Sequence, residues 1–324
     1  MRWVRETGMN VSPARVFLFL VLQLCCYQLA AAQDLSPRAY LITPVGANAA
    51  VLSSSYLNGN IQFSGAVPIT GAREEAYLGI ASYYHALSVF GRSANFTLAV
   101  PYAIADIYGQ VFDVPKTAHR SGSLDSIARF SVNLIGGPAM QPAEFARWTQ
   151  NILLGTSLTI VAPTGQYDPT RLINWGSNRW AFKPELGYSE RWGHWVLDGY
   201  GGVWFYTTNH EFFSHNQYFP GTNTQSQAPT GAVEAHISYD FLPRLWVSFD
   251  ANYWWGGATS INGIENSLTN QRNSRVGMTA SFPLTKHQSI KVSFSDGAYI
   301  RYGGNFRSVS LGWQYGWVGW PKYH

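Results

Sequence analysis

The chain has 324 residues and a formal net charge of +4 at pH 7; 12% of its residues are charged and 15% are aromatic. Soluble domains normally carry about 25% charged residues, so this composition argues against an ordinary soluble protein. Beyond Leu29 no apolar run approaches the roughly 20 residues that a membrane helix needs, which excludes a helical membrane protein. No basic patch interleaved with aromatic residues appears, so we expect no nucleic-acid partner.

Residues 1–32 are predicted to be a signal peptide. Arginines precede an apolar run over 16–29, and three alanines then supply small residues for cleavage. A retained membrane helix and a lipoprotein signal are the alternatives, but the run is short and Leu24, which is not small, precedes Cys25. Cleavage would remove both cysteines, so we expect no disulfide and no thiolate metal site in the mature chain. Residues 33–50 then read as a loose periplasmic lead.

Alternation of apolar and polar residues predicts strands along the rest of the chain, because successive strand side chains point to opposite faces. The pattern is clearest in the hairpin 178–206, where Trp180, Phe182 and Leu186 alternate with Lys183 and Glu185. The apolar face ends in aromatic residues, and the polar face combines charges with glycines. The twelve predicted strands cover residues 51–58, 77–86, 95–102, 125–134, 151–161, the two arms of the hairpin, 233–240, 245–255, 275–282, 290–295 and 306–317.

The connections between these strands are sorted by length. Those after even-numbered strands are short, except 135–150, where a short helix is predicted over 142–148; those after odd-numbered strands are mostly longer. A soluble β-sandwich would have no reason to sort its loops in this way. An even strand number with short turns on one rim and long loops on the other is typical of an outer-membrane barrel. We therefore predict an all-β fold, a transmembrane antiparallel β-barrel over residues 51–317, followed by a C-terminal extension over 318–324.

Several long segments resemble one bacterial family. They read FGRSANFTLAVPYA, RFSVNLIGGPAM, APTGQYDPTRLINWGSNRWAFKPELGYS, LDGYGGVWFYT, LWVSFDANYWWGG, NSRVGMTASFPLTKHQSIKVSFS and LGWQY. The chain is similar in them to the outer-membrane family known as putative meta-pathway of phenol degradation transporters. The resemblance covers most of the mature chain and implies a barrel in the outer membrane of a Gram-negative bacterium that passes hydrophobic or aromatic compounds.

The polar faces of the predicted strands supply the candidate functional residues, which by parity face the lumen. A polar pathway or a proton-sensitive plug is one interpretation; the other is structural, since buried charges must be paired and a narrow barrel fills its interior with side chains. The aromatic members would suit flat apolar solutes, because rings offer stacking surface. The predicted lumen set is Arg129, Lys183, Glu185, Asp198, Tyr200, Trp204, Glu234, His236, Trp246, Asp250, Asn252, Trp254, Arg275 and Lys291.

Other chemistry has little support in the sequence. Glu234 and His236 share a face, but no further ligands follow at suggestive spacing, so we expect no metal ion and no cofactor. A barrel lipase would need a serine, a histidine and an orienting residue at one rim, and no local motif selects a nucleophile. We therefore expect a channel for small hydrophobic or aromatic compounds rather than an enzyme. A barrel enzyme and a structural or interaction barrel remain the alternatives. The expected partners are the solute, outer-membrane lipid and the barrel-insertion machinery.

Overall fold

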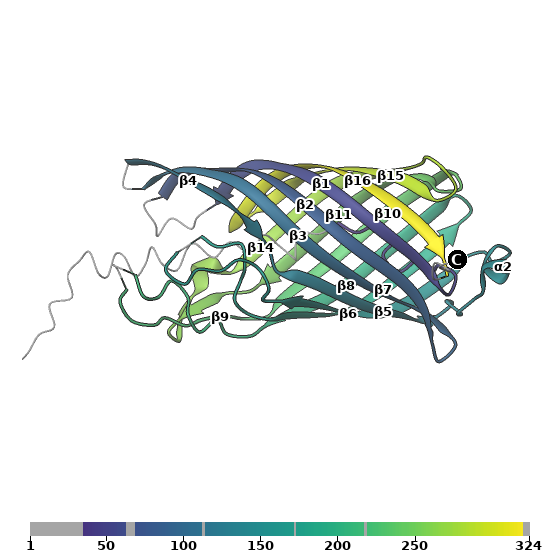
Figure 1. The fold of residues 1–324 in the computed structure, drawn as a ribbon, viewed down its shortest axis with the longest axis horizontal. Coiled ribbons are helices and arrows are strands. Elements are labelled where there is room, and N and C mark those ends of the chain that lie inside the picture. Colours follow the sequence, from purple (N-terminus) through teal and green to yellow (C-terminus); the bar gives the residue numbers. More distant parts are fainter. Residues whose placement is uncertain (1–34, 63–68, 112–113, 172, 217–218, 320–324) are drawn as a thin grey trace, which may run out of the picture.

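The computed structural model of the chain describes residues 35–62, 69–111, 114–171, 173–216 and 219–319. The predicted signal peptide therefore lies outside the described residues. Twelve antiparallel strands form a closed barrel (Figure 1), which confirms the predicted fold. The barrel strands are β1 (Ala47–Gln62), β2 (Ile69–Val89), β3 (Arg92–Val111), β5 (Ser126–Ile135), β6 (Ile152–Ala162), β7 (Ala181–Trp192), β8 (Trp195–Tyr206), β10 (Thr230–Leu242), β11 (Leu245–Gly256), β14 (Gln271–Pro283), β15 (Gln288–Ile300) and β16 (Gly303–Val318).

The sheet closes because its first and last strands meet. β1 pairs with β16 on one side and with β2 on the other, and β2 also pairs with β3. Each remaining strand pairs with its neighbours in the chain order of the barrel. Alternation along the strands sets the two faces, as adjacent residues of β11 show: Phe249 is 52% exposed on the lipid side and Asp250 is 0% exposed inside.

The smaller elements lie at the two rims. β4 and β5 both pair with β3 and lie end to end along it. Leu124 and Asp125, which connect them, interrupt the strand. The helix predicted over 142–148 is a single turn. These elements are β4 (Val114–Ser123), β9 (Gln225–Gln227), β12 (Thr259–Ile261), β13 (Ile264–Asn266), the 3-10 helix η2 (Ser267–Thr269) and α2 (Pro142–Phe145). In Figure 1, α2 and the end of β16 lie at one rim of the barrel and β9 lies at the opposite rim. By the rule that short turns face the periplasm and long loops face outward, the first is the periplasmic rim and the second is the extracellular rim.

Several strands are longer than the sequence predicts, β2 and β3 most of all. β2 has 21 residues and β3 has 20, so much of 59–76 and 103–124, two of the segments expected to be extracellular loops, continues the sheet. Arg73, Glu75 and Asp106 point outward there and are exposed. Above the apolar belt the outer face meets water, so the hydrogen-bonded ladder continues although the apolar alternation has ended.

The lead also differs from its expected form. β1 begins at Ala47 rather than at residue 51. Residues 35–46 run into the barrel and contact side chains of strands far along the chain: Leu35 lies beside Gly277, and Arg38 bonds to Asp240. The described part of this segment, residues 35–46, is called the lumen segment below.

Candidate functional site: the barrel interior

The interior has two unlike sides. We call the inward faces of β5 to β15, taken around the sheet, the charged wall, and the inward faces of β16, β1, β2 and β3 the aliphatic wall. On the aliphatic wall Glu74 is the single charged side chain that points inward among the described residues. Every predicted lumen residue lies on the charged wall: Arg129 on β5, Lys183 and Glu185 on β7, Asp198, Tyr200 and Trp204 on β8, Glu234 and His236 on β10, Trp246, Asp250, Asn252 and Trp254 on β11, Arg275 on β14 and Lys291 on β15.

Ion pairs connect the middle of the charged wall from one strand to the next. Arg129 Nη2 lies 3.6 Å from Glu185 Oε1, and Lys183 Nζ lies 2.7 Å from Glu185 Oε2. Lys183 Nζ also lies 3.6 Å from Glu234 Oε1. Register explains the pattern, because residues two apart on one strand share a face and meet the inward residues of the next strand. Glu185 and Glu234 therefore each have a cation beside them, as a charge in the barrel interior requires.

The series continues through a histidine. His236 Nε2 lies 3.6 Å from Glu234 Oε2, and His236 Nδ1 lies 2.9 Å from Asp250 Oδ1. Thr279 on β14 donates its hydroxyl hydrogen to Asp250 Oδ2 at 2.8 Å. Within the described ranges no group of three or more His, Cys, Asp or Glu side chains could hold a metal ion.

Tyr40 of the lumen segment is seated on two glycines of the charged wall. A methyl group at Gly187 would lie 2.0 Å from the Tyr40 ring, and one at Gly155 would lie 2.5 Å from it. The Tyr40 hydroxyl donates to Glu185 Oε1 at 3.0 Å, and the Arg129 guanidinium carbon lies 4.8 Å from the ring centroid. The ring thus requires positions without side chains, and Gly155 and Gly187 provide them.

Arg38 fixes the preceding turn of the same segment. Its Nη1 lies 2.7 Å from Asp240 Oδ1, and its Nε donates to Ser238 Oγ at 3.0 Å. Its guanidinium carbon lies 4.4 Å from the Trp246 ring centroid. The backbone amide donates to Asp198 Oδ2 at 3.2 Å. The charged wall therefore holds the lumen segment by contacts that no local sequence pattern predicts.

The predicted inward aromatics are packed within the wall. Trp204 and Trp254 are each 1% exposed, and Lys183 Nζ lies 5.4 Å from the Trp204 ring centroid. The ring centroids of Tyr200 and Tyr40 lie 5.1 Å apart, and the two rings are tilted at 53° to each other. These rings fill the interior against cations and the lumen segment; a role in contacting solute stays a prediction.

The aliphatic wall was not singled out by sequence reasoning. Inward side chains at its middle level are half-buried, which leaves part of each facing the interior. The hydroxyls of Ser55 and Ser310 hydrogen-bond to each other at 2.7 Å across β1 and β16. The half-buried members are Val51, Ser53, Ser55, Leu78, Ile80, Ser82, Ala99, Ser308 and Ser310. These residues alternate with lipid-facing ones, as the inward face of a strand should. Because several of them are themselves apolar, the apolar–polar alternation is weak and does not distinguish the two faces.

The extracellular end of the barrel is covered by connected loops. Asp125, at the interruption between β4 and β5, accepts hydrogen bonds from the backbone amides of Gly165 and Ser177, each at 2.9 Å. Through them the loop between β6 and β7 is held to the wall. This loop contains the long family-like segment that begins at residue 162.

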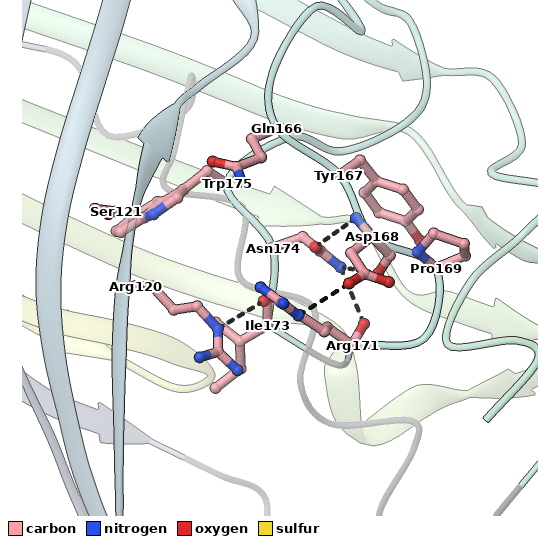
Figure 2. Close-up of a pocket in the computed structure, with 10 residues that line it drawn as sticks. All are labelled: Arg120, Ser121, Gln166, Tyr167, Asp168, Pro169, Arg171, Ile173, Asn174 and Trp175. Carbon is pink, nitrogen blue, oxygen red and sulfur yellow. Dashed lines mark hydrogen bonds and ion pairs between the residues drawn. The ribbon is translucent and has the colours of Figure 1, made fainter. Parts of the chain in front are cut away.

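A cavity of about 370 Å³ lies between β4 and that loop (Figure 2). Arg120 Nε donates to the Ile173 carbonyl at 3.4 Å, and Arg171 Nε pairs with Asp168 at 2.9 Å. Hydrogen bonds from Thr170 lower the pKa of the Asp168 carboxyl below its usual range. The cavity is polar and lies at the extracellular mouth.

Comparison with known proteins agrees with the barrel. A family model described as Putative MetA-pathway of phenol degradation matches residues 45–311. An outer membrane channel from Pseudomonas putida F1 has a TM-score of 0.73 at 18% identity, covering 88% of this chain and 100% of that one. The beta domain of the Bordetella autotransporter BrkA has a TM-score of 0.50 at 13% identity, covering 84% and 100%.

These likenesses to solved structures concern the fold, which is that of Gram-negative outer-membrane β-barrels. No curated protein sequence matches the chain. In the part of the chain that the structure describes, no helix is long and apolar enough to cross a membrane.

Proposed function

We propose that the chain, which belongs to the family of the putative MetA-pathway of phenol degradation, is an outer-membrane channel for small hydrophobic or aromatic compounds. The observation that carries the proposal is the aliphatic wall. Its inward side chains are aliphatic or hydroxyl-bearing and half-buried, whereas the opposite wall is covered by the lumen segment. The aliphatic members of this wall favour apolar solutes, because they offer dispersion contacts, and at its middle level no charged side chain among the described residues is present to pair with an ion.

The proposed role is transport rather than catalysis, and the proposed partners include components outside the barrel. Exposed apolar side chains such as Leu98, Phe249 and Leu311 on the outer face support contact with outer-membrane lipid. Assembly by the barrel-insertion machinery is expected of such a fold. The P. putida protein among the matches is a channel, which supports transport rather than enzymatic activity.

Uptake by intact cells tests the proposal, since the outer leaflet slows apolar solutes that phospholipid alone would admit. Initial uptake of radiolabelled toluene is compared between cells that express the chain and cells with empty vector. We expect faster uptake with the protein. Equal rates with folded protein present would overturn the proposed function.

Two alanines provide a matched pair of variants. Ala99 is half-buried and points inward on β3, whereas Ala81 is exposed on the lipid side of β2. Ala99→Phe adds a ring to the aliphatic wall and should lower toluene uptake several-fold, because overfilled interiors do not relax freely. Ala81→Phe should leave uptake unchanged. An equal effect of both variants would argue against passage along this wall.

A further inference from the structure

Glu74 is an acid in otherwise apolar surroundings at the extracellular end of the aliphatic wall. Register places Ile107 of β3 on one side of it and Gly59 of β1 on the other, and Gly59 in turn faces Phe306 of β16. Two positions further along β2, Ala76 is also buried. The carboxyl is therefore bordered by apolar side chains and by Gly59, against which the backbone of Asn305 and Phe306 packs closely.

Apolar packing closes this end of the wall. Ile61, Ala72 and Phe306 form a buried cluster, with Leu57 and Ile107 packed against it. Phe306 is 2% exposed, although inward side chains at the middle of the wall are half-buried. A solute that reaches the aliphatic wall from outside must first meet this cluster.

Glu74 has no partner for its carboxyl within the described residues. The side chain is 2% exposed, and no hydrogen bond or ion pair joins it to another described residue. Its neighbour Glu75 differs on every point: it points outward, and its carboxylate pairs with Arg73 at 2.9 Å. A buried carboxyl without a donor is costly, and such a group in a native protein calls for an explanation.

We propose that Glu74 recognises the hydrogen-bond donor of an otherwise apolar aromatic solute, such as the hydroxyl group of a phenol. The inference rests on the proposed function and names the solute class of the same passage. The ring would lie against Ile107 and Phe306, and the hydroxyl would donate to the carboxyl. Hydrogen bonds to carboxylates are stronger than those between neutral groups, so one such bond distinguishes phenol from toluene of nearly equal size.

The test measures initial uptake of radiolabelled phenol and toluene by intact cells that express the full chain at matched levels. We expect the wild-type protein to raise phenol uptake over toluene uptake, relative to empty vector. Glu74→Met keeps the side-chain length and removes the strong acceptor, so the ratio should fall roughly ten-fold, toluene uptake being unchanged. Glu74→Gln retains an acceptor oxygen and should recover part of the ratio. Glu75→Met is the matched control and should behave as wild type.

The outcomes separate the two proposals. Uptake of neither solute above vector would overturn the proposed function, and this inference with it. Uptake of toluene with an unchanged phenol-to-toluene ratio in Glu74→Met would overturn the inference alone. Folding is checked by heat-dependent gel mobility, and Met in an apolar site is expected to fold. The wild-type ratio is an independent readout: a ratio equal to that of vector cells contradicts the inference without any variant.

Discussion

The two walls of the barrel interior differ in how their inward side chains fill the narrow lumen. On the charged wall, cations and carboxylates from several strands pair with one another and hold Arg38 and Tyr40 of the lumen segment. On the aliphatic wall, the described inward side chains are uncharged apart from Glu74, and those at its middle level are half-buried. The difference teaches that the polar residues most conspicuous in the sequence build the filled side of the lumen. The inconspicuous ones border the side that remains accessible.

Removing a central acid of the charged wall should have the largest effect. Asp250 is 0% exposed and bonds both His236 and Thr279. Asp250→Ala leaves a buried histidine and a hydroxyl without their acceptor, and breaking such a buried pair costs about 3–5 kcal/mol. Equilibrium unfolding in lipid vesicles measures this loss. Asp250→Asn retains an acceptor and should cost clearly less; an equal cost would contradict the pairing argument.

Displacing the lumen segment should have an intermediate effect on stability and a visible effect on conductance. Gly187→Ala forces a methyl group into the Tyr40 ring, and overpacking of this kind costs about 1–3 kcal/mol. If the ring leaves its seat, single-channel conductance in planar bilayers should rise. Gly199→Ala is the control, since nothing lies within 4 Å of a methyl group there. Unchanged conductance in Gly187→Ala would show that the segment does not fill the charged side.

The aliphatic wall should tolerate change best. Ser310→Ala removes the hydrogen bond to Ser55, which contributes about 0.5–1.5 kcal/mol. Ser54→Ala, on the exposed lipid side of β1, should cost nothing measurable. The free energies of unfolding of Ser310→Ala, Ser54→Ala and Asp250→Ala, measured under the same conditions, compare the two walls directly. A loss for Ser310→Ala as large as that for Asp250→Ala would erase the distinction between them.

The sequence predicts the barrel because its signal is local. Alternation such as that of Phe249 and Asp250 can be recognised without knowing the partner strand. The lengths of the connections also differ systematically between even- and odd-numbered strands. Strand ends above the apolar belt could not be predicted, since residues such as Arg73 and Asp106 meet water on the outer face and break the alternation. Paired backbone continues there without any apolar pattern.

The interior was harder to predict than the wall that encloses it. Parity predicts that Trp204 and Asp250 point inward, and both side chains are buried, but parity cannot predict which residues cover them. The cover comes from Arg38 and Tyr40, whose side chains hydrogen-bond to residues more than a hundred positions away in the chain. No periodicity marks the lumen segment. Glu74 was missed for a related reason, because the segment around it reads as a loop.

The position of the lumen segment also restricts how the protein can be assembled. The segment immediately precedes β1, and β1 closes the barrel by pairing with β16, more than 240 residues later in the chain. Arg38 and Tyr40, however, contact strands from β5 to β11. The interior must therefore receive the beginning of the chain before or while its end completes the circumference. Contacts between such distant parts of a chain make folding slow, because loop closure precedes any gain from them. The pairing of β1 with β16 therefore closes the barrel around the lumen segment, which directly precedes β1. A circular permutant opened elsewhere would have to insert that segment in a different order.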